Sequence, residues 1–106
     1  GVTVFPSEIE KLVMDEIPEV KEACAAAKSD VRTGDVIVLF VTTEKRLAEE
    51  DKRKLTEKLT AFITERLSVY SAPEKVYYVS EFPKTLVGKV DVNKLKEIYL
   101  GSDVTE

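Results

Sequence analysis

The sequence contains no histidine and no tryptophan, and it has a single cysteine, Cys24. Without histidine the chain cannot assemble a Ser/His/Asp or Cys/His catalytic site, and histidine-ligated metal sites are excluded. A lone cysteine cannot form an internal disulfide. Because Cys24 lies in the small-residue run Ala23–Ala27, we interpret it as a buried structural thiol rather than a reactive one. No metal site is expected.

The sequence also lacks an excess of basic residues and any long apolar run. It has 16 Lys and Arg residues and 20 Asp and Glu residues, which gives a net charge of -4. Nucleic-acid binding usually needs a basic face, so we expect no nucleic-acid partner. No run approaches the roughly 20 apolar residues of a membrane span, and no signal-peptide pattern opens the sequence, so we expect a cytoplasmic protein.

The residues that are present describe one globular domain spanning 1–106. Of the 106 residues, 43% are hydrophobic and 34% are charged, which is typical of a folded soluble chain. A chain of this length removes roughly 60 to 70 per cent of its unfolded surface from water when it folds. The start, on glycine instead of methionine and almost at once on a helix signal, suggests a piece of something larger.

Apolar spacing predicts both helices and strands. Helices are expected from Pro6 until Pro18 ends the run, over 55–67, and from Val92 to Tyr99. Strands are expected at 2–5, 20–28, 36–41 and 75–80, with a loop or hairpin turn over 30–35 and a solvated loop and helix entrance over 44–54. The run VIVLFV at 36–41 has the composition of a central strand covered on both faces.

Strands and helices thus alternate in the order β, α, β, β, α, β, α. This order predicts an α+β fold in which a small mixed β-sheet is flanked by helices. In the strand over 75–80 the adjacent Tyr77 and Tyr78 must point to opposite faces, and we expect one in the core and the other on the surface.

The most informative segment is Phe82–Asp91, FPKTLVGKVD, between the last strand and the last helix. Pro83 ends the strand, Gly88 permits a tight turn that presents Lys89 outward, and Asp91 can cap the helix. A phosphate-binding P-loop would need glycine in place of Pro83 and Ser or Thr after Lys89, so that interpretation fails. On these grounds alone, a lysine in such a turn is usually only solvated.

Two segments together carry a resemblance to a known family. The first ten residues, GVTVFPSEIE, resemble a G-x-x-V-x-P-x-E-I-E segment, and Pro73–Leu95 resembles a proline, a strand, P-K-T-x-x-G-K and a helix with leucine. Both patterns belong to the C-terminal domain of the adenylate-forming superfamily, which includes acyl-CoA synthetases, peptide-synthetase adenylation domains and luciferases. The matching positions in the second segment are Pro83, Lys84, Thr85, Gly88, Lys89 and Leu95.

The resemblance implies a two-step ligase reaction. A carboxylate attacks the α-phosphorus of Mg-ATP to give an acyl-adenylate and pyrophosphate, and the CoA thiol then displaces AMP. It implies that Lys89 enters the active site as an electrostatic contact in the first step, with Gly88 and Lys84 near the nucleotide. Gly1 and Val2 match the CoA-side loop of the second step, where a glycine lets the backbone pass close to the pantetheine arm.

The resemblance also implies partners for this chain. ATP, Mg²⁺, CoA and a carboxylic acid would be handled by the full-length enzyme, whose large N-terminal domain lies outside this sequence. The isolated chain is therefore expected to bind none of them and to be inactive. The version PKTLVGKV is most similar to long-chain fatty-acid CoA ligases, which implies possible association of the full-length enzyme with a membrane surface.

Two alternatives remain open at this point. The chain could come from an amino-acid-activating domain of a peptide synthetase, or it could be a stand-alone α+β interaction or regulatory module with an accidental Gly-Lys turn. One departure is also present: the family usually carries an arginine just after the lysine turn, where this chain has Val92 and Asn93. That substitution puts in doubt any contact assigned to the arginine, but not the role of Lys89.

Overall fold

The computed structural model describes residues 6–30, 34–67 and 72–100. In chain order, its elements are α1 (Pro6–Glu16), β1 (Val20–Asp30), β2 (Gly34–Thr43), α2 (Glu49–Arg66), β3 (Lys75–Tyr78) and α3 (Val92–Leu100). This α+β arrangement confirms the fold class expected from the sequence. The short strand expected at 2–5 lies outside the described residues.

The three strands form one mixed sheet in the order β1-β2-β3. β1 pairs antiparallel with β2, from Val20 opposite Thr43 to Asp30 opposite Gly34, and β2 pairs parallel with β3. The run 36–41 is therefore in the central strand, as expected. The predicted loop over 30–35 is wrong at both ends, because the backbone ladder continues to Asp30 and resumes at Gly34. Polar residues can extend a strand when a partner backbone is in place.

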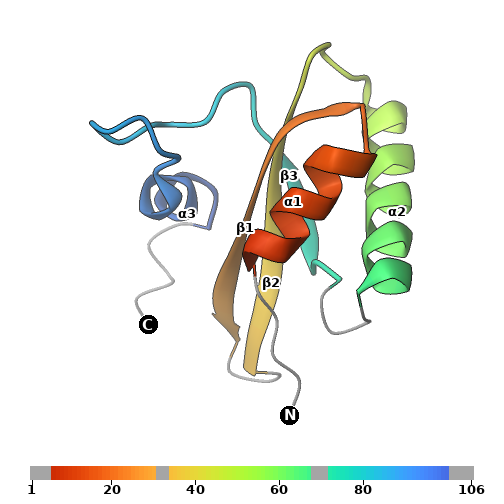
Figure 1. Ribbon diagram of the computed structural model, residues 1–106, viewed down its shortest axis with the longest axis horizontal. Coiled ribbons are helices and arrows are strands. Elements are labelled where there is room, and N and C mark those ends of the chain that lie inside the picture. Colours follow the sequence, from red (N-terminus) through yellow and green to blue (C-terminus); the bar gives the residue numbers. More distant parts are fainter. Residues whose placement is uncertain (1–5, 31–33, 68–71, 101–106) are drawn as a thin grey trace.

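Helices cover both faces of the sheet (Figure 1). Successive side chains of β2 point to opposite faces and so contribute to a core on each side. Leu39 and Val41 of β2 pack with α1 and α2 in one cluster of buried residues, which also contains Ile9, Val13, Ile17, Leu55, Leu59 and Ile63. Val38 and Phe40 point to the other face and pack in a second cluster with Cys24, Ala26, Val79, Phe82 and Leu95 of α3. The sheet is thus an inner layer between two cores.

The two tyrosines of β3 also point to opposite faces of the sheet, but their burial differs from the one expected. Tyr77 packs against the second cluster, where its ring stacks on Phe40 with centroids 5.2 Å apart. Tyr78 packs against the first cluster. Both side chains are half-buried. The prediction of one core and one surface tyrosine is wrong because helices cover both faces of the sheet.

The charged segment 44–54 contains a loop and the beginning of α2. The helix starts at Glu49, earlier than the first apolar residue of its stripe, Leu55. Lys52, Arg53 and Lys54 pair with acidic residues three or four positions away on the same exposed surface. Such pairs support a solvated helix face. The segment is solvated as expected, but much of it is helical.

Candidate functional site

The candidate site is a hairpin that projects from the domain, and the two sides of the hairpin meet at its base. Phe82 is buried in the second cluster, with 2% of its surface exposed, and anchors the departing chain. The backbone N–H of Asp91 donates to the Pro83 carbonyl over 2.8 Å, so the returning chain meets the departing chain there. We call the segment Lys84–Val90 the lysine hairpin; Figure 1 shows it in blue, projecting from the molecule beyond β3 and α3.

Backbone hydrogen bonds fix the shape of the lysine hairpin. Lys84 and Val90 form an antiparallel bridge. The Thr85 N–H donates to the Lys89 carbonyl over 2.7 Å, and the Gly88 N–H donates to the Thr85 carbonyl over 2.9 Å. The Thr85 hydroxyl oxygen accepts from the Lys89 N–H over 3.3 Å. These bonds describe a three-residue loop of the kind in which a turn is followed by a left-handed residue.

Gly88 is the left-handed residue that this loop requires, with φ at +88°. A Cβ added at Gly88 would meet no heavy atom within 4 Å, so the space around it is open. The need for glycine therefore comes from the backbone conformation and not from crowding. This confirms the turn expected from the sequence.

Lys89 combines a fixed backbone with an exposed side chain. Its N–H and its carbonyl are both bonded to Thr85, while the residue as a whole is exposed. Within the described residues, no carboxylate lies within 4.0 Å of its ammonium group. The neighbouring tip residues Leu86 and Val87 are 107% and 78% exposed. The fold thus presents a cation on a defined support, close to apolar side chains that nothing in the described chain covers.

Lys84 has a partner within the domain. Its ammonium group lies 3.3 Å from a carboxylate oxygen of Glu22 on β1, and both side chains are 40% exposed. A half-exposed pair of this kind contributes about 0 to 1 kcal/mol. The structure therefore gives Lys84 a modest role in tying the base of the hairpin to the sheet, and its contact with a nucleotide stays a prediction.

The returning chain enters α3 through the predicted cap. The Asp91 carboxylate accepts from the Lys94 N–H over 3.1 Å, and the Asp91 carbonyl accepts from the Leu95 N–H over 3.1 Å. Leu95 is fully buried in the second cluster. The hairpin is consequently anchored on both sides, by Phe82 before it and by Leu95 after it.

The other sequence-based expectations have mixed outcomes. Cys24 is buried, and burial, with a smaller contribution from Glu10, raises the pKa of its thiol to about 11. The thiol therefore stays protonated near neutral pH, which fits a structural role. Gly1 and Val2, expected in the CoA-side loop, lie outside the described residues. Lys84, Gly88 and Lys89 are the site residues that the structure brings together.

Glu10 has a specific contact that sequence reasoning left open. Its carboxylate accepts a hydrogen bond from the Ala25 N–H over 2.8 Å. Ala25 belongs to β1, which is an edge strand of the sheet. Glu10 thus satisfies a backbone donor on an open sheet edge and holds α1 against β1.

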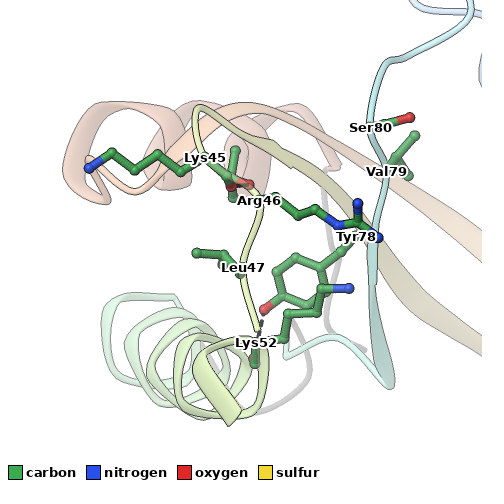
Figure 2. Close-up of a pocket in the computed structure, with 8 residues that line it drawn as sticks. Lys45, Arg46, Leu47, Lys52, Tyr78, Val79 and Ser80 are labelled. Atoms are coloured by element: carbon green, nitrogen blue, oxygen red, sulfur yellow. Dashed lines mark hydrogen bonds between the residues drawn. The ribbon is translucent and has the colours of Figure 1, made fainter. Parts of the chain in front are cut away.

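A second surface feature was missed by sequence reasoning. A pocket of about 470 Å³ lies among the loop after β2, the beginning of α2 and the end of β3 (Figure 2). Arg46, Lys52 and Tyr78 are among its lining residues. The sequence gave no signal for this pocket, because Arg46 and Lys52 lie in a charged segment and Tyr78 lies in a distant strand. We call this feature the basic pocket.

The described residues do not form a metal centre. No group of three or more Cys, Asp and Glu side chains among residues 6–30, 34–67 and 72–100 is arranged to hold a metal ion. These residues therefore provide no all-protein cage for the Mg²⁺ that the family resemblance implies for the full-length enzyme, where Mg²⁺ would be held largely by the phosphates of ATP. No helix in this part of the chain is both long and apolar enough to cross a membrane.

Comparison with known proteins identifies the family of this fold. Residues 8–89 match the AMP-binding enzyme C-terminal domain, and the matched span ends on Lys89. The chain is 36% identical to 2-succinylbenzoate–CoA ligase of Lactococcus lactis over 91% of this chain and 19% of that protein. It is 30% identical to the human mitochondrial acyl-coenzyme A synthetase ACSM1 over 92% of this chain and 17% of that protein.

A solved structure also shares the fold of this chain. An acyl-CoA synthetase structure from Brucella canis superimposes with a TM-score of 0.74 at 25% identity, over 90% of this chain and 17% of that one. The chain spans about a fifth of the length of the curated relatives it matches. The match covers most of the chain and includes the hairpin up to Lys89. The chain belongs to the family of AMP-binding enzyme C-terminal domains.

Proposed function

We propose that this chain is the C-terminal part of an ATP-dependent carboxylic acid–CoA ligase and that Lys89 is its adenylation residue. The observation that carries the proposal is the geometry of the lysine hairpin. It holds the backbone of Lys89 at both N–H and carbonyl and leaves the side chain exposed. A cation supported in this way can enter a site on another domain without being reorganised there.

The proposed role of Lys89 is electrostatic. In the first half-reaction a carboxylate oxygen of the substrate bonds to the α-phosphorus of ATP, and the bond from that phosphorus to pyrophosphate breaks. Both reacting groups are anionic, so a fixed ammonium group offsets their repulsion and stabilises the charge on the five-coordinate phosphorus. Lys89 takes no proton in this step. Mg²⁺, when bound, would supply further charge from outside the described residues.

The second half-reaction is proposed to use another face of the chain. The CoA sulfur bonds to the acyl carbon and its thiol proton passes to solvent, while AMP leaves with the electrons of the broken carbon–oxygen bond. Gly1 and Val2 are proposed to line the CoA path, on the family resemblance alone. The proposal requires the domain to turn between the two steps, so that Lys89 withdraws as the CoA-side loop approaches.

The rest of the active site is proposed to lie in a large N-terminal domain of the same polypeptide. The support is that the matched span is only 19% and 17% of the length of two curated relatives. On its own, the 106-residue chain is then inactive. The full-length enzyme is proposed to act in the cytoplasm.

For the acyl substrate we propose a long-chain fatty acid, on the similarity of PKTLVGKV to ligases of that group. Association of the full-length enzyme with a membrane surface would then give access to such substrates. The relatives named above do not single out long chains, since one is named for 2-succinylbenzoate. The acyl-binding residues are proposed to lie in the N-terminal domain.

Pyrophosphate release by the full-length protein tests these proposals. The panel would contain palmitate, octanoate, 2-succinylbenzoate and the amino acids, each with ATP and Mg²⁺, and each with and without CoA. We expect release with palmitate to exceed release with the other acids. A preference for 2-succinylbenzoate or octanoate would overturn the long-chain proposal. A preference for an amino acid would indicate a peptide-synthetase fragment, and no release with any acid would overturn the ligase proposal.

A further inference from the structure

The basic pocket lies where the two parallel strands of the sheet end. β2 ends at Thr43 and β3 at Tyr78, and these strands are paired in parallel. Ligands of open sheets commonly bind just outside the carboxyl ends of parallel strands. The pocket's volume of about 470 Å³ is within the range of roughly 300 to 1,000 Å³ that small-molecule sites occupy. None of its lining residues belongs to the lysine hairpin.

Two positive side chains turn toward the pocket. Figure 2 shows the guanidinium group of Arg46 and the ammonium group of Lys52 on the side of Tyr78, whereas the ammonium group of Lys45 points away from them. Within the described residues, no carboxylate lies within 4.0 Å of the Arg46 guanidinium. The pocket therefore has a cation that is available to an incoming anion.

Lys52 is held near the same space by an aromatic ring. Its ammonium group lies 5.8 Å from the centre of the Tyr78 ring. It also lies 3.6 Å from a carboxylate oxygen of Glu49, but the Glu49 side chain is 94% exposed. An ion pair as exposed as this one is weak, so Glu49 competes little with a ligand anion.

Hydrogen bonds fix the walls of the pocket. The Tyr78 hydroxyl donates to the Lys52 carbonyl over 2.9 Å and therefore accepts from the Thr56 hydroxyl, which lies 2.8 Å away. The Thr43 hydroxyl donates to the Lys45 carbonyl over 2.6 Å and fixes the loop that carries Arg46. The Tyr78 hydroxyl has thus donated its only proton and is held in place by two partners, so we expect its ring to be the surface that a ligand meets. A pocket fixed in this way loses little freedom on binding.

We propose that the basic pocket binds a nucleoside phosphate, with the phosphate between Arg46 and Lys52 and the nucleoside against Tyr78 and Leu47. A guanidinium group matches phosphate oxygens through paired hydrogen bonds, and an ammonium group adds a point charge. The pocket is larger than a phosphate group alone, and an aromatic ring and a leucine offer an apolar wall for the remainder of the ligand. This site is separate from the one proposed for Lys89.

The test is a titration of the 106-residue chain with ADP, followed by calorimetry and by backbone NMR shifts, with adenosine as the ligand that lacks phosphate. We expect saturable 1:1 binding of ADP, with adenosine at least about tenfold weaker. Arg46→Ala and Lys52→Met should each weaken ADP binding by about tenfold or more. Circular dichroism of each variant would verify that the fold is retained.

Lys45→Ala is the matched control, because it removes the same charge from the rim of the pocket while its amine points away. We expect it to change ADP affinity less than twofold. Absence of saturation, or equal binding of adenosine and ADP, would overturn the proposal. If Lys45→Ala weakened ADP binding as much as Arg46→Ala does, the binding would reflect only general attraction of ADP to positive charge, and the proposal would be overturned. A tenfold loss with Lys89→Ala would place ADP at the hairpin instead and overturn it too.

Discussion

The centre of the sheet and the tip of the lysine hairpin are built from the same residue types in opposite surroundings. Leu39 and Val41 in β2 are 0% exposed, whereas Leu86 and Val87 at the hairpin tip are 107% and 78% exposed. The first pair fills a core under two helices, and the second contacts no core of the described chain. The burial of a leucine or valine here depends on its position in the fold and not on its residue type. The exposed apolar tip therefore contributes little to the free energy of unfolding.

The hairpin is nonetheless attached firmly at its base. Phe82 is 2% exposed and Leu95 is 0% exposed, and both belong to the cluster that contains Phe40. Asp91 joins the two sides by its hydrogen bonds to Pro83 and to the first turn of α3. The molecule thus separates a buried support, which determines stability, from an exposed tip, which is free to act. Matched substitutions in the two regions test that separation.

The largest effect is expected from Leu39→Ala in the central strand. Removing a fully buried leucine side chain should lower the free energy of unfolding by about 2 to 5 kcal/mol, because transfer energy is lost and a cavity remains. Urea unfolding followed by circular dichroism measures it. A loss below about 1 kcal/mol would show that the core around β2 is loosely packed and would remove the basis of the comparison.

Gly88→Ala should have the next largest effect, about 1 to 2 kcal/mol, because alanine is strained at a positive φ. Gly88→Asn is the matched control, and it should cost less since asparagine tolerates the left-handed region better. The same unfolding measurement applies to both. Equal losses for the two variants would mean that something other than backbone conformation requires glycine there.

Asp91→Ala should lower the free energy of unfolding by about 1 kcal/mol through loss of the cap on α3. Asp91→Asn keeps an oxygen acceptor for the Lys94 N–H, and we expect it to restore most of that loss. Thermal unfolding of the three proteins at one pH gives the comparison. If asparagine were as damaging as alanine, the carboxylate charge and not the cap hydrogen bond would be the stabilising feature.

Leu86→Ala makes the same chemical change as Leu39→Ala at the hairpin tip and should have the smallest effect. We expect the free energy of unfolding to change by less than about 0.5 kcal/mol, as for most exposed positions. A loss of 2 kcal/mol or more by urea unfolding would show that the tip packs against the domain, and the two regions would no longer differ.

The sequence predicted much of this fold because its strongest signals are local. The run VIVLFV identified the central strand, and the pattern Pro83, Gly88, Asp91 predicted the turn and the helix cap that the structure shows. The start of α2 was placed too late because charged residues carry no apolar periodicity, although i,i+4 ion pairs support a helix there. Local patterns are thus a better guide to apolar elements than to charged ones.

Features that depend on distant parts of the chain could not be predicted in the same way. The burial of both Tyr77 and Tyr78 follows from helices on both faces of the sheet, which β3 alone does not reveal. The Lys84–Glu22 pair and the basic pocket each join residues more than thirty positions apart, and no spacing rule connects them. Lys89 was proposed as a site residue from family resemblance, since a lysine in a turn has no specific signal of its own.

The most direct test of the central claim separates the two half-reactions of the full-length enzyme with Lys89→Ala. We predict that adenylation, measured by pyrophosphate release, falls by about 100-fold or more, on the scale of losing one contact to transition-state charge. Thioester formation from preformed acyl-adenylate and CoA should change far less, and the unfolding midpoint should match that of the unmodified enzyme. An equal loss in both half-reactions, or unchanged adenylation, would contradict the role proposed for Lys89.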